Sequence, residues 1–314
     1  MPETRSQSES QSRERIRLGL CCLFVDEPSV RFRTTTARNL SRLSFSEQRA
    51  KLLGLTRDNA EALRNAVNAC VRLGIESFRV QSGLLPLATH PDHRYGVADL
   101  AAETLGFFRE ATAQARVSNL RLSFHPDQFV LLSSPNESVT AASLLDLELH
   151  GDLAELLGAD AINIHAGGAY GDKAAALDRL AVNLGRLSDR VRSRLTFEND
   201  DRTFHVRDLL PLCRKEGTPL TYDVHHHRCH PDGLSIGEAS TEAAATWNRE
   251  PLFHISSPKD GWDAANPRSH SDMIDPADFP QEWRAIAATR GLTVDVEAKA
   301  KEKAVLDLKA ELAL

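Results

Sequence analysis

Eight short runs of apolar and β-branched residues recur along the chain, separated by longer segments of mixed character. Their nearly continuous hydrophobic character is typical of strands that are buried on both faces of a parallel sheet. Each gap between runs is long enough for the crossover helix that a parallel pair of strands requires. The candidate strands begin at Ile16, Ser77, Arg121, Ala161, Arg194, Leu220, Leu252 and Leu292.

Segments with helical periodicity fill the gaps between these runs. The segments 56–74, 142–158 and 173–193 are rich in alanine and leucine, with apolar residues at helical spacing. Thr56 and Thr140 are candidate N-caps, and Gly74 and Gly158 are candidate C-caps. Eight strands that alternate with helices predict an α/β fold, the (β/α)8 or TIM barrel. In that fold the active site lies at the C-terminal mouth of the strands.

The two ends of the chain differ from this repeat. Residues 1–15 are polar and rich in serine, glutamine and glutamate, so we expect a disordered tail. Residues 16–314 are then expected to form a single barrel domain that ends in an amphipathic C-terminal helix. Two long segments, 24–47 and 258–280, are predicted to be loops, and loops of that length in a compact domain are often functional.

Composition narrows the class of protein. Hydrophobic residues make up 41% and charged residues 26% of the 314 residues, as in a globular protein with a sizeable core. No apolar run approaches the roughly 20 residues of a membrane span, and no signal-peptide core is evident, so we expect a cytoplasmic protein without a membrane partner. The five cysteines lack the spacing of a thiolate zinc site. The net charge of −6 argues against a uniformly basic nucleic-acid-binding surface, but not against a local basic groove.

Side chains that bind metals stand at or just after the ends of six predicted strands. Because the strand ends of a barrel meet at one mouth, these side chains should converge there and predict a polynuclear metal site. Imidazole with carboxylate suits Zn²⁺ or Mn²⁺. Taken singly, each histidine could instead bond to a backbone group, and each carboxylate could cap a helix. The residues are His125, His165, Glu198, Asp223 with His226, His254 and Glu297.

Two reactions fit such a site on this fold. Several cations suit hydrolysis of a phosphodiester, because they activate water and stabilise charge on the phosphoryl oxygens. Metal-assisted isomerisation of a sugar is the alternative. Within the run 225–227, His225 and His227 would point away from His226 in a strand and are expected to be packing neighbours.

Four longer motifs give the chain a family resemblance. RLSFHPDQFV, NIHAGGAYGDK, LTFENDDRTF and DVHHHRCHPDGLS resemble the UV damage endonuclease family, relatives of the barrel nuclease endonuclease IV, from about Ile16 to Lys301. The resemblance implies a barrel that nicks damaged double-stranded DNA immediately 5′ to ultraviolet photoproducts and some other lesions, leaving a 3′-hydroxyl. It implies Mn²⁺, as two or three ions, with Zn²⁺ or another divalent metal as alternatives. We expect a monomer without a nucleotide cofactor.

The resemblance also implies roles for individual residues. Gln128 and Phe129 occupy the place of a Gln-Tyr pair that family members push into the duplex at the lesion. Phe129 has an aromatic ring that can stack on a base, as the tyrosine of that pair does, but it lacks the tyrosine hydroxyl. The candidate catalytic residues are Glu198, Asp223, His254 and Glu297. The implied metal ligands are His90, His125, His165, Glu198, Asp223, His226, His254, His270 and Glu297.

The chain departs from some family members at two positions. Leu20 and Leu252 stand where those members have a tyrosine near the end of the first strand and a lysine two residues before the seventh-strand histidine. The number and affinity of the metals are therefore open, and a lesion-binding protein that does not cut DNA is a second alternative. Segment 31–44 contains four arginines, which either contact phosphates or form an ordinary solvated loop: Arg31, Arg33, Arg38 and Arg42.

Overall fold

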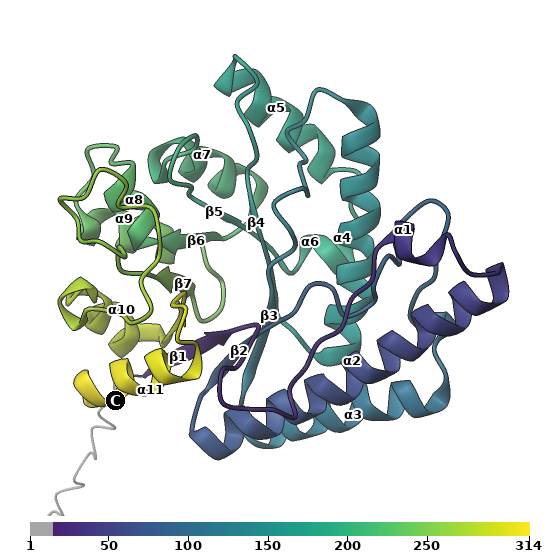
Figure 1. Ribbon diagram of the computed structural model, residues 1–314. Coiled ribbons are helices and arrows are strands. Elements are labelled where there is room, and N and C mark those ends of the chain that lie inside the picture. The colour runs from purple at the N-terminus through teal and green to yellow at the C-terminus, as the bar shows by residue number, and fades with distance from the viewer. Residues whose placement is uncertain (1–14) are drawn as a thin grey trace, which may run out of the picture.

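The computed structural model describes residues 15–314, so residues 1–14 of the predicted disordered tail lie outside the described residues. Eight parallel strands close into a barrel in the order β1-β2-β3-β4-β5-β6-β7-β8 (Figure 1), which confirms the TIM-barrel prediction. The strands begin where the sequence predicts, except that β5 begins one residue later than Arg194. They are β1 (Ile16–Cys21), β2 (Ser77–Val80), β3 (Arg121–Phe124), β4 (Ala161–His165), β5 (Leu195–Glu198), β6 (Leu220–Asp223), β7 (Leu252–Ile255) and β8 (Leu292–Val296).

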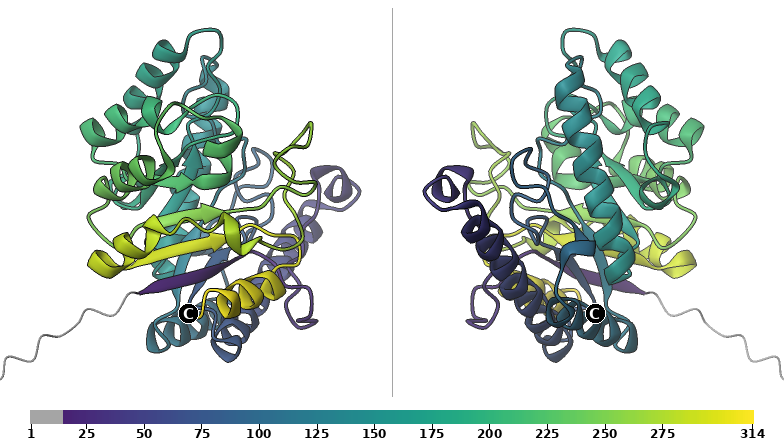
Figure 2. Two further views of the ribbon diagram at one scale, coloured as in Figure 1. Left: turned by 90° about the vertical axis from the view of Figure 1, so that its left-hand side faces the viewer. Right: turned by 90° about the vertical axis from the view of Figure 1, so that its right-hand side faces the viewer.

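Helices surround the barrel and connect each strand to the next. In the side views of Figure 2, α2 and α3 run together along one flank, and α11 lies against β1. The helices are α1 (Ala37–Leu40), α2 (Phe45–Leu73), α3 (Ala102–Val117), α4 (Glu137–Leu157), α5 (Lys173–Leu184), α6 (Asp189–Arg192), α7 (Val206–Glu216), α8 (Val224–Cys229), α9 (Ile236–Ala245), α10 (Glu282–Arg290) and α11 (Glu302–Glu311). Two short 3₁₀ helices, η1 (Val97–Asp99) and η2 (Pro276–Asp278), lie in loops.

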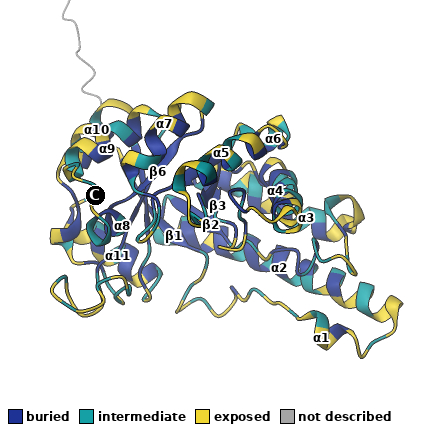
Figure 3. Ribbon diagram, turned by 90° about the horizontal axis from the view of Figure 1, so that it is seen from above, coloured by how far each residue is buried: buried dark blue, intermediate teal, exposed yellow. Residues whose placement is uncertain are grey.

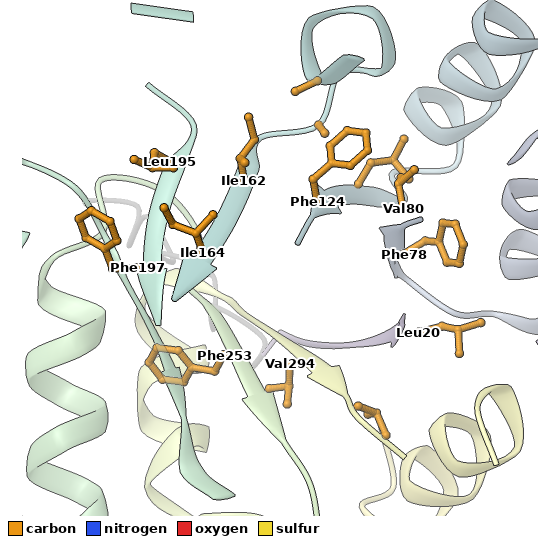
Figure 4. Close-up of a cluster of buried hydrophobic side chains, with 14 of the residues drawn as sticks. Leu20, Phe78, Val80, Phe124, Ile162, Ile164, Leu195, Phe197, Phe253 and Val294 are labelled. Atoms are coloured by element: carbon orange, nitrogen blue, oxygen red, sulfur yellow. The ribbon is translucent and has the colours of Figure 1, made fainter. Parts of the chain in front are cut away.

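Alternate positions of each strand face two different environments. Leu20, Phe78, Phe124 and their equivalents pack between the barrel and its helices (Figure 4). The residues between them face the barrel interior, and many are polar, unlike the continuous apolar strands that the sequence reading assumed. They include Ser77, Arg79, Ser123, Asn163, Thr196, Thr221, Thr293 and Asp295. Some of these polar side chains form hydrogen bonds with one another. The Thr221 hydroxyl donates to the Thr196 hydroxyl (3.0 Å), which donates to the Asn163 side-chain oxygen (2.9 Å).

Both predicted C-caps are confirmed, but both predicted N-caps are wrong. Gly74 and Gly158 end α2 and α4 in the left-handed conformation that favours glycine. Ser44 caps α2 through a reciprocal capping box with Glu47, so Thr56 lies within the helix and its hydroxyl donates to the Leu52 carbonyl. Asn136 caps α4, and Thr140 lies in its first turn.

The remaining predicted segments differ from the structure in detail. The predicted helix 173–193 is two helices, α5 and α6, because the chain turns at Gly185 and Ser188 caps a new helix. The predicted loop 24–47 contains α1 and the start of α2, and the loop 258–280 contains η2. The C-terminal amphipathic helix is present as α11 and buries Val305 and Leu308. Among residues 15–314, no helix is both long and apolar enough to cross a membrane.

Candidate metal centre

Seven of the predicted site residues meet at the mouth of the barrel. His165, Glu198 and Asp223 are the last residues of β4, β5 and β6, and His254 lies in β7. His125 and Glu297 directly follow β3 and β8, and His226 lies in the first turns of α8. Because strand side chains alternate, each of these strand positions faces the interior. We call this set the mouth cluster: His125, His165, Glu198, Asp223, His226, His254 and Glu297.

Glu198 is the centre of the mouth cluster. It is 1% exposed, and three imidazoles surround its carboxylate. His125 Nε2 lies 3.1 Å from Glu198 Oε2, while His226 Nδ1 and His254 Nδ1 lie 3.2 and 3.3 Å from Oε1. The Asn163 side-chain amide also donates to Oε2. The carboxylate is therefore held from several sides in one orientation.

Two groups of potential ligands share Glu198. In the group His125, His165 and Glu198, one atom from each residue lies within 4.8 Å of the others, and the same holds for Glu198, Asp223 and His254. A carboxylate with one oxygen toward each group is suited to bridge two cations. The arrangement therefore suggests divalent metals, with nitrogen and oxygen donors of the kind that Zn²⁺ and Mn²⁺ accept.

Several buried polar atoms in the cluster have no hydrogen-bond partner. They include His165 Nδ1, Asp223 Oδ2 and His254 Nδ1, which lies near Glu198 but outside hydrogen-bonding geometry. A buried polar atom without a partner costs about 1 to 3 kcal/mol. A cation bound among these atoms would remove that cost, so the donor set fits metal ions.

The charges in the cluster stabilise one another. Burial alone would raise the pKa of the Glu198 carboxyl, but the imidazoles of His254 and His165 hold that pKa well below its usual range. Burial would likewise lower the pKa of His226, yet Asp223 and Glu198 raise it well above its usual range. The Glu198 carboxylate thus remains ionised, and His226 takes up a proton that a bound cation would displace.

Arg79 in β2 and Asp295 in β8 support the cluster, although the sequence did not single out either residue as part of the site. The Arg79 guanidinium donates from Nε to Asp295 Oδ2 (3.0 Å), from Nη1 to Glu297 Oε1 (2.6 Å) and from Nη2 to His254 Nε2 (2.9 Å). Burial would raise the pKa of Glu297, but Arg79 and His254 hold it well below its usual range. Strand alternation could have placed both residues in the interior, since Asp295 precedes Glu297 by two positions.

Gly19 makes room for this support. A Cβ atom on Gly19 would stand 2.2 Å from Asp295 Oδ1 and 3.1 Å from Ser77 Cβ. Both neighbours are fully buried, so neither can move aside freely. The glycine in β1 therefore allows the Asp295 carboxylate to reach Arg79.

The two loop histidines are placed differently. His270 Nδ1 lies 3.8 Å from Glu297 Oε2 and 3.2 Å from Ser256 Oγ, at the edge of the cluster. His90 follows β2, and its nearest ring is that of His93, with centroids 5.0 Å apart. The structure does not bring His90 into either three-residue ligand group of the described residues.

The histidine run forms a helix rather than a continued strand. Asp223 caps α8 by accepting from the His226 backbone N–H (2.7 Å), and the helical turn directs the His226 ring toward Glu198. His225 packs against His270 and is buried, while the Tyr222 hydroxyl bonds to His227 (2.7 Å). Asp223 thus has both of the functions that the sequence reading treated as alternatives: it caps a helix and faces the cluster.

Two clefts border the mouth cluster. The first has a volume of about 390 Å³ and is lined by Gln128, His165 and His226 among others. Phe129 follows Gln128 in the loop after β3 and is 73% exposed. The second cleft, of about 470 Å³, lies on the other side, against Arg79 and Glu297. The cluster is therefore flanked by a hollow on each side.

The two departures from the family pattern lie away from the mouth. Leu20 packs in the layer between the barrel and its helices (Figure 4). Leu252 is 1% exposed and packs with Ala161 and Trp247, below the level of His254. Neither side chain offers a polar atom, so neither contributes a ligand.

In TIM-barrel enzymes the active site lies at the C-terminal ends of the strands. The histidines and carboxylates of this closed barrel converge at that end, so the protein belongs to the class of TIM-barrel enzymes. The family model described as UV-endonuclease UvdE matches residues 16–314. The chain belongs to this UV damage endonuclease family, which confirms the resemblance read from its motifs, and it is an endonuclease, a hydrolase of phosphodiesters.

Individual relatives agree with this assignment. The chain is 36% identical to the UV DNA damage endonuclease of Bacillus velezensis over 300 residues, covering 93% of this chain and 91% of that protein. The crystal structure of SacUVDE matches with a TM-score of 0.83 and 26% identity, covering 95% and 99% of the two chains. Endonuclease IV from Thermus thermophilus has a TM-score of 0.61 at 15% identity, with the same coverage, and shares the fold.

Proposed function

We propose that this enzyme is a metal-dependent DNA repair endonuclease that incises damaged double-stranded DNA immediately 5′ to cyclobutane dimers, 6-4 photoproducts and other distorting lesions, leaving a 3′-hydroxyl. One observation carries the proposal. The buried Glu198 carboxylate joins two groups of metal-type ligands whose unpartnered atoms a cation would satisfy. The curated relatives are named UV DNA damage endonucleases, which supports DNA as the substrate.

The proposed cofactor is Mn²⁺, as two or three ions, with Zn²⁺ or another divalent metal as the alternative. His125, His165 and Glu198 would hold one ion, and Glu198, Asp223 and His254 would hold another. His226 and Glu297 border the same atoms. His270 and His90 are further proposed ligands; His270 has the stronger support because it lies beside Glu297.

Bound divalent cations would supply Lewis acidity that stabilises charge on the phosphoryl oxygens. The protein residues would orient the reactants around them. Asp223 is fixed through one oxygen by the His226 N–H, and its other oxygen faces the site. The Glu297 carboxylate is ionised and aligned by Arg79, so it is suited to accept a hydrogen bond from the attacking water. With Glu198 and His254, these residues form the proposed catalytic set.

We propose that Gln128 and Phe129 probe the duplex for lesions. A photoproduct weakens stacking and pairing, so extrusion of its nucleotides costs less than extrusion from intact duplex. The exposed Phe129 ring can fill the space that is left and stack on a neighbouring base, without the hydroxyl that a tyrosine would add. Recognition through distortion predicts a broad range of lesions.

The other proposed properties concern the whole protein. We propose that residues 16–314 act as a single domain, that the enzyme is a monomer in the cytoplasm, and that it needs no nucleotide cofactor. The family assignment favours this function over sugar isomerisation. The experiment below also distinguishes an incising enzyme from a protein that binds lesions without cutting DNA.

The test incubates the protein and Mn²⁺ with a duplex that carries one cyclobutane dimer. An undamaged duplex and the Glu198→Gln variant are the controls. We expect a single cut immediately 5′ to the dimer, absent from both controls. Binding of the damaged duplex without cutting would identify a lesion-binding protein, and neither binding nor cutting would reject the proposal.

A further inference from the structure

Helix α2 is too long for the barrel that it covers. It has 29 residues, about 43 Å, whereas its neighbour α3 has 16 residues, about 24 Å. The C-terminal end of α2 is fixed, because Gly74 caps it and β2 begins at Ser77. The surplus must therefore project at the other end, where helices begin after strands, which is the mouth side of the barrel.

The projecting part of α2 is solvated. No residue from Phe45 to Lys51 is buried, and the first buried residue of the helix is Leu52. Figure 3 shows the exposed start of α2 and the neighbouring α1 extending beyond α3. In Figure 2 this end lies at the outer limit of the molecule, on the side of the loops that follow the strands. These turns bury no residue against the barrel, and Arg49 ties them to the loop after β2 through the Arg94 carbonyl (3.2 Å) and Asp99 (2.7 Å).

The same segment is strongly basic. We call residues 31–51 the basic arm; it comprises the end of the loop after β1, α1 and the start of α2. The arm has six basic residues and one acidic residue, a net charge of +5, in a chain whose net charge is −6. The basic residues are Arg31, Arg33, Arg38, Arg42, Arg49 and Lys51.

Most of this charge is not neutralised within the protein. Arg33 pairs with Asp58 (3.5 Å) and Arg49 with Asp99 (2.7 Å). Among the described residues, the other four basic side chains form no ion pair with a carboxylate, although Arg31 shares a hollow with Asp58 and Glu61. The acidic residue of the arm, Glu47, is engaged by the Ser44 cap. All four unpaired cations are exposed: Arg31, Arg38, Arg42 and Lys51.

We propose that the basic arm is a second DNA contact, which binds the phosphate backbone of the duplex away from the incision site. The inference rests on the proposed function, since it takes damaged duplex as the substrate at the mouth cluster. Duplex DNA is a rod of regularly spaced phosphates, so an arm that projects on the mouth side can reach phosphates beyond the lesion. Phosphate contacts position the protein and carry no sequence or lesion information.

A phosphate contact can be detected by how strongly the DNA-binding constant depends on salt concentration. Each phosphate contact on duplex DNA contributes about 0.9 to the slope of the logarithm of the binding constant against the logarithm of salt concentration. Arg38→Gln with Arg42→Gln should therefore make that slope shallower by up to about 1.8 and weaken binding by at least about fivefold. The loss should be equal for damaged and intact duplexes.

Arg109→Gln with Arg116→Gln is the matched control. Both control arginines are exposed on α3 and removal of both changes the net charge by the same amount. Thermal melting of each variant establishes that the fold is retained. The rate of incision at saturating enzyme, measured in a single turnover with Mn²⁺, should be unchanged in the arm variant, so that the effect appears in affinity alone.

Three results would overturn the inference: a slope and affinity equal to those of the control variant, a loss confined to the damaged duplex, or a lower single-turnover rate at unchanged affinity. Each of these leaves the proposed function intact, because the wild type still cuts. If the wild-type protein neither binds nor cuts damaged duplex, the proposed function fails first. The two failures are therefore distinguishable.

Discussion

Gly19 illustrates how a residue with no chemistry of its own can determine the site. Its missing side chain is the space that the Asp295 carboxylate occupies, and Asp295 aligns Arg79. We predict that Gly19→Ala lowers the free energy of unfolding by about 1 to 3 kcal/mol, the usual range for overpacking a tight interior. The measurement is denaturant unfolding of the metal-free protein.

Gly54→Ala is the control for that substitution. Gly54 lies in α2, and a Cβ atom there would meet nothing within 4 Å. Alanine is the better helix former, so this variant should gain roughly 0.5 to 1 kcal/mol. The free energy of unfolding should therefore fall in Gly19→Ala and rise in Gly54→Ala. A Gly19→Ala protein as stable as the wild type would show that Asp295 can move.

Phe129 tests recognition at the scale of one side chain. Because its ring is 73% exposed, Phe129→Ala should leave the melting temperature almost unchanged. Loss of one stacking contact, about 1 to 3 kcal/mol, should weaken binding to the damaged duplex by roughly 5- to 150-fold, with a much smaller effect on intact duplex. Fluorescence anisotropy with both duplexes measures the ratio, and Phe129→Tyr should retain affinity. Equal losses for the two duplexes would argue against lesion probing.

At the scale of elements, the caps of α2 and α4 should behave differently. Ser44 begins the projecting turns of α2, which bury nothing before Leu52, whereas Asn136 begins α4, whose first turn includes the buried Thr140. We predict that Asn136→Ala lowers the free energy of unfolding by about 1 kcal/mol. Ser44→Ala should instead fray the first turns of α2 with little global effect, which faster amide exchange confined to residues 45–51 would reveal. Global destabilisation by Ser44→Ala would mean that the arm packs on the barrel.

The elements also show how far the sequence could predict the fold. The start of every strand was predictable to within one residue, because each strand buries apolar side chains against the helices. The helix starts were not, since Thr56 and Thr140 fit the cap preference but Ser44 and Asn136 have the actual geometry. Cap preference alone cannot choose between two candidates when the residues that directly follow the true cap, 45–51 in α2 and 137–139 in α4, are not buried.

The placement of the candidate site residues was predictable where they follow strand ends and less so elsewhere. His125, His165, Glu198, Asp223 and His254 follow from the period of two along a strand and the convergence of strands at the mouth. Arg79 and Asp295 obey the same period of two, but neither follows a strand end, so the pattern of potential ligands at strand ends does not include them. The position of His90 depends on the path of a loop, for which a single sequence holds no comparable rule.

At the scale of the whole molecule, metal binding and stability should be linked through pH. In the metal-free protein, the lowered pKa values of Glu198 and Glu297 contribute stability above their ordinary value of 4.5, and that stability is lost as the pH falls below it. The raised pKa of His226 contributes stability that is complete below 6.5 and is lost as the pH rises through its folded value. These groups alone would make the metal-free protein most stable between about pH 4.5 and 6.5, while the pKa of His165, which burial lowers, opposes the His226 contribution below 6.5.

Bound metal ions should change how stability depends on pH above about 6.5. A histidine must lose its proton to bind a cation, so the cation replaces the protons that stabilise the metal-free cluster at low pH. We therefore predict that the rise in melting temperature on adding Mn²⁺ is small near pH 5.5 and increases toward pH 8, as fewer protons compete with the cation for the histidines. Calorimetric melting of chelator-treated protein with and without Mn²⁺ measures this difference. Glu198→Gln is the control, because without the shared carboxylate the difference should be close to zero at every pH. A gain that does not depend on pH would mean that the ions bind away from the histidines of the mouth cluster.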